Sequence, residues 1–307
     1  MSLKIIKNKI RGVNKTHKVT KAMEAVSAVK MRKSQERALL GRPYAVAALN
    51  VLKRVGGSFD ASSHPLVSVR EVKRIAIVVV TSDKGLAGNL NSAVLKAVHD
   101  EIERRGIVSE QYEFICLGRK GYEHFAKRGF KVIHHAQNIS DGVEHKDLEE
   151  ITSLLANRFT NKDYDLCLIV FTSFISTFEH NAVVRILLPL NPSEIEATVR
   201  DITPARGRYA KEEQSREPIT ATLRYEVEPS VEVVLNELLP YLLGINVYHA
   251  MLEAKASEHS SRMVAMKNAS DKARDMSKDL TREFNKERQT LITREVSEIV
   301  GGIEAMR

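Results

Sequence analysis

The stretch INVYHAMLEAKASEHSSRMVAMKNASDKARDMSKDLTREFNKERQTLITREVSEIV, residues 245–300, runs for 56 residues without a glycine or a proline. Glycine and proline are the residues that most often interrupt helices. One continuous helix of this length would measure about 84 Å at roughly 1.5 Å per residue. Typical globular helices have only about 8–20 residues, so the stretch predicts a rod that carries position or force and not an element of a compact core.

A second helix is predicted over residues 3–40. Its apolar residues recur at steps of three and four, the spacing of a coiled-coil seam, with lysine and arginine around them. Gly41 and Pro43 weaken this helix, although the residues after them can continue it. Since neither terminal helix can bury its seam alone, we expect residues 1–57 and 230–307 to form an antiparallel coiled coil, with the longer C-terminal helix projecting past its partner. The seam of the first helix contains Ile6, Ile10, Val13, Val19, Met23 and Val26.

Residues 73–200 alternate short apolar runs with helix-like stretches. This alternation predicts a Rossmann-like, doubly wound α/β domain between the two coiled-coil helices. The last apolar run is expected to lie antiparallel at the edge of the sheet. The predicted strands are residues 74–81, 112–118, 130–135, 163–174 and 183–190, and the predicted helices are residues 92–105, 119–128 and 146–159.

Residues 201–229 are expected to form a loop and a possible edge strand. The first part, 201–218, is polar and contains prolines and a glycine, which is typical of a mobile loop. The segment TLRYEVEP (222–229) is the possible strand. Ser230 follows a proline and is a suitable N-cap for the C-terminal helix.

The net charge of +8 is concentrated at the N-terminus. Residues 1–54 contain 14 Lys and Arg residues against two acidic residues, a local charge of +12. This implies an acidic partner, although a solvated face is the commonest meaning of a charged helix. From composition alone, an acidic protein and a nucleic acid remain alternatives. No aromatic residue precedes Tyr44 to stack on bases, and the apolar seam requires a protein partner.

The loop TSDKGLAGNLN (81–91) lies between a predicted strand and a predicted helix, where phosphate-binding loops are found. It matches neither GxxxxGK[ST] nor GxGxxG. It is therefore either a phosphate cradle or a tight turn that joins strand to helix or touches a neighbour. HExxH, CxxC and GxSxG motifs are absent from the sequence, so we expect no catalytic residue, no metal and no cofactor.

The two cysteines, Cys116 and Cys167, lie in apolar runs and are expected to be free buried thiols in a reducing compartment. The basic N-terminus is not followed by the apolar region of a signal peptide. No apolar run approaches the roughly 18 residues of a membrane span. We expect any work at a membrane to be done through partners.

The C-terminal end, LITREVSEIVGGIEAMR, is more apolar than the middle of the rod. Burial in a core would explain this, but a projecting helix has no core of its own. We therefore expect this tip to turn in an apolar socket supplied by other chains. Its apolar residues are Leu291, Ile292, Val296, Ile299, Val300 and Ile303.

Three blocks of the sequence closely resemble the gamma subunits of F-type ATP synthases, of the bacterial type. They are IKNKIRGVNKTHKVTKAMEAVSAVKMRKSQ (6–35), the loop at 81–91, and the pair SEHSSRMVAMKNASDKA (257–273) and NKERQTLITREVSEIVGG (285–302). The blocks occur in the order of that family and the likeness spans nearly the whole chain. The C-terminal block departs from the family because Gly302 is followed by isoleucine where alanine is usual.

The resemblance implies a central rotor shaft without a catalytic site of its own. Its partners would be three alpha and three beta subunits, the epsilon subunit and the ring of c subunits. Ion flow would turn this ring, and the shaft would drive ATP synthesis in the beta subunits and regulate their activity and the ion flow. The chain would be a peripheral membrane protein on the cytoplasmic face of the bacterial inner membrane. The residues implied to contact the beta subunits are Met23, Glu258, Arg262, Arg288 and Gln289.

Two other functions fit parts of the sequence. A nucleic-acid-binding helical protein would use the basic N-terminal helix, and its binding would depend steeply on salt. A stand-alone α/β enzyme with helical appendages would need a catalytic constellation, and the motifs above supply none.

Overall fold

The computed structural model describes residues 3–56, 64–191, 228 and 230–306. The chain forms two compact units, one from Met1–Ser27 with Arg262–Arg307 and the other from Ala28–Ser261. The loop and possible edge strand expected at residues 201–229 lie outside the described residues, apart from residue 228.

The unit of residues 28–261 is built on a five-stranded sheet with the order β3-β2-β1-β4-β5. The first four strands are parallel, and β5 runs antiparallel to β4 at the edge. This confirms the predicted Rossmann-like sheet, including its antiparallel edge strand. The strands are β1 (Ile75–Val80), β2 (Tyr112–Leu117), β3 (Lys131–Ala136), β4 (Leu166–Phe174) and β5 (His180–Leu188).

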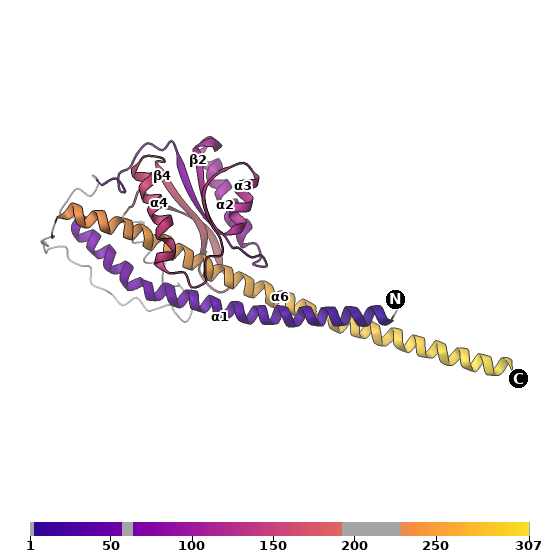
Figure 1. Ribbon diagram of the computed structural model, residues 1–307. Coiled ribbons are helices and arrows are strands. Elements are labelled where there is room, and N and C mark those ends of the chain that lie inside the picture. Colours follow the sequence, from indigo (N-terminus) through magenta and orange to yellow (C-terminus); the bar gives the residue numbers. More distant parts are fainter. Residues whose placement is uncertain (1–2, 57–63, 192–227, 229, 307) are drawn as a thin grey trace. The chain divides into compact units, whose positions relative to one another are not determined.

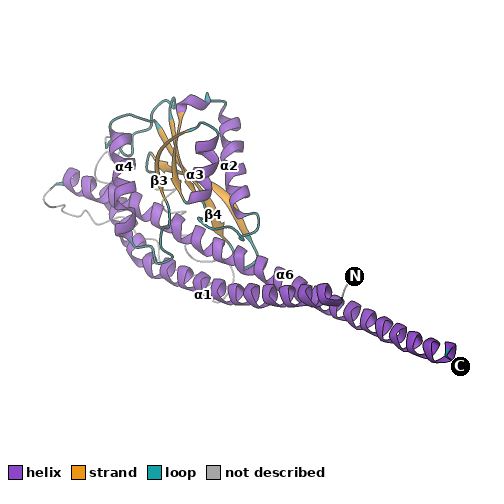
Figure 2. Ribbon diagram, turned by 45° about the vertical axis from the view of Figure 1, so that its right-hand side comes forward, coloured by secondary structure: helices purple, strands orange, loops and turns teal. Residues whose placement is uncertain are grey.

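Helices cover both faces of the sheet, which explains why β1, β2 and most of β4 are continuously buried. The odd-numbered residues of β1, from Ile75 to Val79, pack against α2 (Leu90–Arg105) and α3 (Arg119–Lys127). Figure 2 shows these two helices on one side of the strands and α4 on the other. A short 3₁₀ turn, η2 (Ser109–Gln111), precedes β2.

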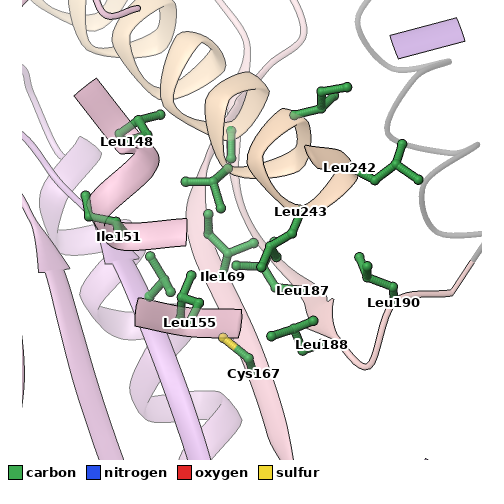
Figure 3. Close-up of a cluster of buried hydrophobic side chains, with 14 of the residues drawn as sticks. Leu148, Ile151, Leu155, Cys167, Ile169, Leu187, Leu188, Leu190, Leu242 and Leu243 are labelled. Atoms are coloured by element: carbon green, nitrogen blue, oxygen red, sulfur yellow. The ribbon is translucent and has the colours of Figure 1, made fainter. Parts of the chain in front are cut away.

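The opposite face carries the larger core cluster. The predicted helix at residues 146–159 is divided into a 3₁₀ turn, η3 (His145–Leu148), and α4 (Glu149–Thr160). Figure 3 shows Leu243 of α6 beside the strand residues Ile169 and Leu187, with the side chains of α4 nearby. The long C-terminal helix is therefore part of the core of this unit and not an appendage to it. The labelled core residues are Leu148, Ile151, Leu155, Cys167, Ile169, Leu187, Leu188, Leu190, Leu242 and Leu243.

Each of the two terminal helices continues through a proline. The N-terminal helix α1 (Leu3–Gly56) continues through Pro43. The C-terminal helix α6 (Val231–Ala305) has 75 residues and includes Pro240. At its start, the backbone N–H of Val233 donates to the side-chain oxygen of Ser230 (3.3 Å), which confirms the predicted N-cap.

One stretch of α6 is long and apolar enough to cross a membrane by composition, and 44% of this stretch is buried inside the protein. This stretch was not identified from the sequence, because only uninterrupted apolar runs were considered. Its apolar residues from Leu235 to Ala254 belong to the core cluster against the sheet. Burial of these residues against the sheet accounts for the apolar composition of this part of α6.

Gly118 ends β2 at a position that only glycine can occupy. Its φ is +114°, and a Cβ built on it would lie 2.0 Å from the carbonyl oxygen of Thr81. This close approach brings the ends of β1 and β2 together under the loop of residues 81–91. The loop itself is held by Asn91, whose side-chain oxygen accepts the backbone N–H of Ser82 (2.9 Å).

Candidate functional site

In the unit formed by residues 1–27 and 262–307, α1 and α6 pair as the antiparallel coiled coil predicted from the sequence. The Nδ1 atom of His17 lies 3.0 Å from the carbonyl oxygen and from the hydroxyl of Ser270. The hydroxyl of Ser277 donates to the side-chain oxygen of Asn14 (2.7 Å). Between these two contacts the residue number falls from 17 to 14 on α1 and rises from 270 to 277 on α6, so the helices run in opposite directions.

The seam of this pair combines apolar and small polar side chains. Ile6 is fully buried, although it lies only three residues from the start of α1. Small side chains allow two helix backbones to approach closely, and hydroxyl groups on them can bond across the seam. The buried residues of the seam are Ile6, Thr20, Ser27, Met266, Ser270 and Ala273.

The C-terminal end of α6 extends beyond the start of α1 (Figure 1), as the sequence predicted. Counting along both helices from the Ser277–Asn14 contact places Leu3, the first residue of α1, level with Arg288. Every residue from 288 to 306 whose side chain is described is exposed. The helix continues through Gly301 and Gly302 to Ala305.

The exposed end presents an apolar stripe. The six apolar residues predicted for the tip are between 46% and 63% exposed. Five of them, from Ile292 to Ile303, follow the spacing i, i+4, i+7, i+8 and i+11, which keeps them on one face of a helix. Met306, which is 85% exposed, falls on the same stripe and was missed from the sequence because it lies after the last periodic isoleucine. We call Ile292, Val296, Ile299, Val300, Ile303 and Met306 the tip stripe.

The first turns of α1 present an uncompensated positive charge. Among the described residues of this unit, Lys21 is the cation of these turns that forms an ion pair, with Glu24 at 3.1 Å. Acidic residues of α6 in this unit form ion pairs with cations of α6 itself, such as Asp271 with Arg274. Six exposed cations of these turns have no ion pair with any residue that the structure describes: Lys4, Lys7, Lys9, Arg11, Lys15 and Lys18.

The five residues implied to contact beta subunits differ in exposure. Arg288 and Gln289 are exposed and lie level with or just past the start of α1. Met23 is half-buried, whereas Arg262 and Glu258 are each only 8% exposed.

The structure brings two of these five residues to a similar level. His17 of α1 contacts Ser270 of α6. Met23 lies six residues further along α1, and the position six residues before Ser270 on α6 is within about one helical turn of Arg262. Met23 and Arg262 are therefore at a similar level of the coiled coil. Glu258 belongs to the other unit.

The loop of residues 81–91 is occupied by contacts within the chain. It lies at the carboxyl end of β1, beside β4, where the strand order reverses and related folds bind nucleotides. Here the hydroxyl of Ser261 on α6 donates to the carbonyl oxygen of Ala87 (2.6 Å). Of the two interpretations of this loop, the geometry matches the turn that touches a neighbour.

A small cavity remains at this reversal point, and residues of α6 line it together with the strand ends. Its walls include Thr81, Asp83, Thr172, Lys255 and Glu258. The hydroxyl of Thr172 is buried and has no hydrogen-bond partner. Among the described residues, no group of three or more His, Cys, Asp and Glu side chains could hold a metal ion.

The buried ionisable groups of this unit are tuned by their surroundings. Burial raises the pKa of Cys116 to about 12 and also raises the pKa of Cys167, so both thiols are unreactive. Burial, with Arg185 nearby, lowers the pKa of His249 to about 4. Hydrogen bonds from His259 and Lys30 hold the pKa of Asp141 well below its usual range, against the effect of burial.

Comparison with known proteins agrees with this architecture. The family described as ATP synthase matches residues 2–306. The ATP synthase gamma chain of Pelotomaculum thermopropionicum is 36% identical over 305 residues, 99% of each chain. That of Heliobacterium modesticaldum is 36% identical over 301 residues, 98% of each chain.

Solved structures give the same result. The central stalk and c-ring structure of the Tetrahymena thermophila mitochondrial ATP synthase contains a chain that is 26% identical. It matches with a TM-score of 0.60 over 82% of this chain and 99% of that chain. A chain of the Euglena gracilis mitochondrial ATP synthase, 16% identical, shares the fold with a TM-score of 0.63 over 99% of this chain and 94% of that chain. The protein therefore belongs to the family of ATP synthase gamma chains.

Proposed function

We propose that this chain is the central rotor shaft of a bacterial F-type ATP synthase. It couples rotation of an ion-driven ring of c subunits to ATP synthesis in catalytic beta subunits, and it has no catalytic site of its own. It regulates the activity of those subunits and the ion flow through the angle at which it stands. The tip stripe is the observation that carries this proposal.

An exposed apolar stripe on an isolated helix requires a cover. Contiguous apolar surface on a soluble protein marks an interaction site. Within the described chain the tip stripe packs against nothing, because α1 begins level with Arg288. A ring of alpha and beta subunits, three of each, supplies a socket of this kind around a single helix.

The charge of the coiled coil supports an acidic protein partner around it. Six cationic side chains of the first turns of α1 are exposed without an ion pair in the described part of this unit. Acidic loops of beta subunits are the partner of matching charge. The half-buried Met23 offers an uncharged surface among these cations, which permits sliding.

Arg288 and Gln289 are the polar residues best placed for a directional contact higher on the shaft. Both are exposed, and they stand where the two-helix rod becomes a single helix. A guanidinium offers fixed donors to carboxylates. Glu258 and Arg262, which are largely buried, would act closer to the seam, with Arg262 contributing only the edge of its side chain.

The coupling proposed here is rigid-body allostery. A shaft that is not threefold symmetric presses differently on each of three beta subunits, so each binds nucleotide with a different affinity. The α/β domain would contact the epsilon subunit and the c ring. The chain would thereby be held on the cytoplasmic face of the inner membrane through its partners.

Assembly with the head subunits tests this proposal. The chain is co-expressed with the alpha and beta subunits of the same enzyme and the mixture is separated by size-exclusion chromatography. We expect a complex with three alpha, three beta and one copy of this chain. A chain lacking residues 288–307 serves as the matched variant, because it keeps the whole two-helix pair and removes the tip stripe.

The outcomes are distinct. A full-length chain that elutes alone would contradict the shaft function. Equal recovery of the complex with and without residues 288–307 would show that the tip stripe does not carry the interaction. Salt-dependent shifts of DNA or RNA in a gel would favour the nucleic-acid alternative instead.

A further inference from the structure

Two histidines from neighbouring helices meet on the α2–α3 side of the sheet. The Nε2 atom of His99 on α2 lies 3.0 Å from the Nε2 atom of His124 on α3. Both residues are half-buried, so the pair is neither enclosed in the core nor free in solvent. The rotor function makes no use of these two side chains.

The backbone beneath each histidine is held by the core. The two helices lie side by side in both views (Figures 1 and 2). Val98, next to His99, and Phe125, next to His124, are fully buried in the cluster that packs α2 and α3 against the sheet. The ring of Phe125 stacks on that of Phe114 in β2, with centroids 4.3 Å apart. The fold itself therefore brings the two imidazoles together, on rigid elements of the kind that precise ligand sites require.

The hydrogen bonds around the pair assign its protons. The Nη1 atom of Arg128 lies 3.0 Å from Nδ1 of His124. A guanidinium can only donate, so this Nδ1 accepts, and the proton of a neutral His124 is on Nε2. That N–H donates to Nε2 of His99, which therefore directs a lone pair towards its partner. One imidazole already has the form that binds a metal ion, and the other needs only to move its proton from Nε2 to Nδ1.

The separation of the two nitrogens fits a single metal ion between them. Imidazole nitrogens bind Zn²⁺ at about 2.0–2.1 Å. Two bonds of that length at a right angle, as in tetragonal Cu²⁺ and Ni²⁺ sites, place the nitrogens about 2.9 Å apart, whereas the tetrahedral angle of zinc places them about 3.4 Å apart. The observed 3.0 Å is close to the tetragonal value. Only a small rotation of either ring is needed to admit the ion.

We propose that His99 and His124 form a binding site for a divalent late transition-metal ion, with Cu²⁺ favoured over Zn²⁺. Among the described residues no third His, Cys, Asp or Glu joins them, so water completes the coordination. Imidazole suits these ions, and Cu²⁺ binds such ligands most tightly in the first row, whereas Mg²⁺ requires oxygen ligands. The two histidines are 25 residues apart, so no short ligand motif in the sequence contains them. The site lies wholly within the unit of residues 28–261 and is independent of the rotor function.

Arg128 limits the affinity of this site. When a metal ion occupies both Nε2 atoms, the proton of His124 lies on Nδ1 and faces Nη1 of Arg128, 3.0 Å away. Two donors then point at each other, and the charge of the guanidinium repels the ion. The guanidinium can withdraw to the carbonyl oxygen of His124, from which Nη1 lies 3.3 Å. Arg128→Ala should therefore tighten metal binding, which a purely structural histidine pair does not predict.

Calorimetric titration of the full chain with CuCl₂, without a histidine tag, tests the site. His99→Ala and His124→Ala should each weaken the tightest site by about tenfold or more, because even the loss of a group behind a metal ligand costs about 10–100-fold. His135→Ala is the matched control: it removes an exposed histidine of the same domain, stacked on Tyr122, and should bind as the parent does. ZnCl₂ should bind more weakly than CuCl₂, and MgCl₂ should not compete.

Pulsed electron paramagnetic resonance with one equivalent of Cu²⁺ counts the ligands. The modulation from remote ring nitrogens should show two imidazoles in the parent chain and one in each single variant. Circular dichroism checks that the variants fold; if His99→Ala or His124→Ala does not, Arg128→Ala still decides, because it changes only an exposed side chain and must raise the affinity. A single imidazole in the parent, equal affinity for the parent and His99→Ala, or competition by Mg²⁺ would overturn the site.

Discussion

His259 Nε2 stands 2.9 Å from the Oδ1 atom of Asp141, so a side chain of the longest helix meets a loop carboxylate that also bonds the N-terminal helix. The opposite oxygen of the carboxylate accepts from Lys30 at 2.7 Å. The pair joins three elements that are separated by more than a hundred residues along the chain. Its charge state should therefore be visible in the stability of the whole unit.

Replacing this carboxylate should change how stability depends on acid. Hydrogen bonds from His259 and Lys30 lower the pKa of Asp141 in the folded state, so its contribution is present above the unfolded pKa of about 3.9 and is lost as the pH falls from there towards the folded pKa. Asp141→Asn should cost about 1–3 kcal/mol at pH 7. Urea unfolding between pH 3 and pH 7 should give a flatter profile for the variant over the acid range. Parallel profiles would contradict this role of Asp141.

His249 should make the protein less stable in moderate acid. It is buried, and burial together with Arg185 lowers its folded pKa to about 4, below the unfolded value of about 6.5. The unfolded chain then binds a proton that the folded chain does not, so stability falls as the pH drops from about 6.5 to about 4, by up to about 3 kcal/mol. His249→Phe should remove this slope. Melting temperatures measured across that pH window check it, and an unchanged slope would assign the effect to another group.

Gly118 should tolerate no side chain. The added Cβ of Gly118→Ala would lie 2.0 Å from the carbonyl oxygen of Thr81, at a φ of +114°. We expect a loss of at least about 3 kcal/mol. Gly129→Ala is the matched control, because Gly129 also has a positive φ but open space around it, and should lose only about 1 kcal/mol. Equal losses measured by denaturant titration would rule out the clash as the cause.

The tip stripe should matter for assembly and not for folding. Ile299 is 63% exposed, so Ile299→Asp should leave the free energy of unfolding of the isolated chain within about 0.5 kcal/mol. Binding to the alpha and beta subunits should weaken by about 2 kcal/mol or more, because a charge enters an apolar socket. Ser297→Asp adds the same charge to the other face of the helix and should bind normally. Equal affinities for the two variants, measured by titrating the assembled head, would exclude a socket on this face.

Met23→Lys should impair coupling in the complete enzyme. The new ammonium would add an attraction to an acidic loop at a half-buried point on the coiled coil, and would resist rotation past it. Ion pumping per ATP should fall, while ATP hydrolysis persists. Met276→Lys, at an exposed position on α6, introduces the same charge elsewhere on the rod as a control. An unchanged coupling ratio for Met23→Lys would count against the contact assigned to this residue.

Much of the architecture is already determined by the order of residues. Absence of helix breakers from residue 245 to residue 300 specifies a long helix, because helix propagation needs only uninterrupted backbone donors. Continuous apolar strands separated by helices specify a parallel sheet buried on both faces. The order of the three matching blocks specifies the family. These features can be predicted because each depends on residues that are close together in the sequence.

Other features depend on contacts between distant segments. The passage of α1 through Pro43 goes against local propensity, and packing of Ala45, Ala48 and Leu49 in the core accounts for it. The serines at positions 257, 260 and 261 resemble a solvated face in the sequence, yet they bond carbonyl groups of strand β4 and of two different loops.

The exposure of the tip is decided in the same way. In the sequence, the apolar residues of the tip are equally compatible with a buried core. The structure shows that they are uncovered, because α1 begins level with Arg288. The spacing of apolar residues in the sequence shows which faces of a single helix are apolar. Only the tertiary structure decides which of those faces another part of the chain covers, because burial is a property of pairs of surfaces.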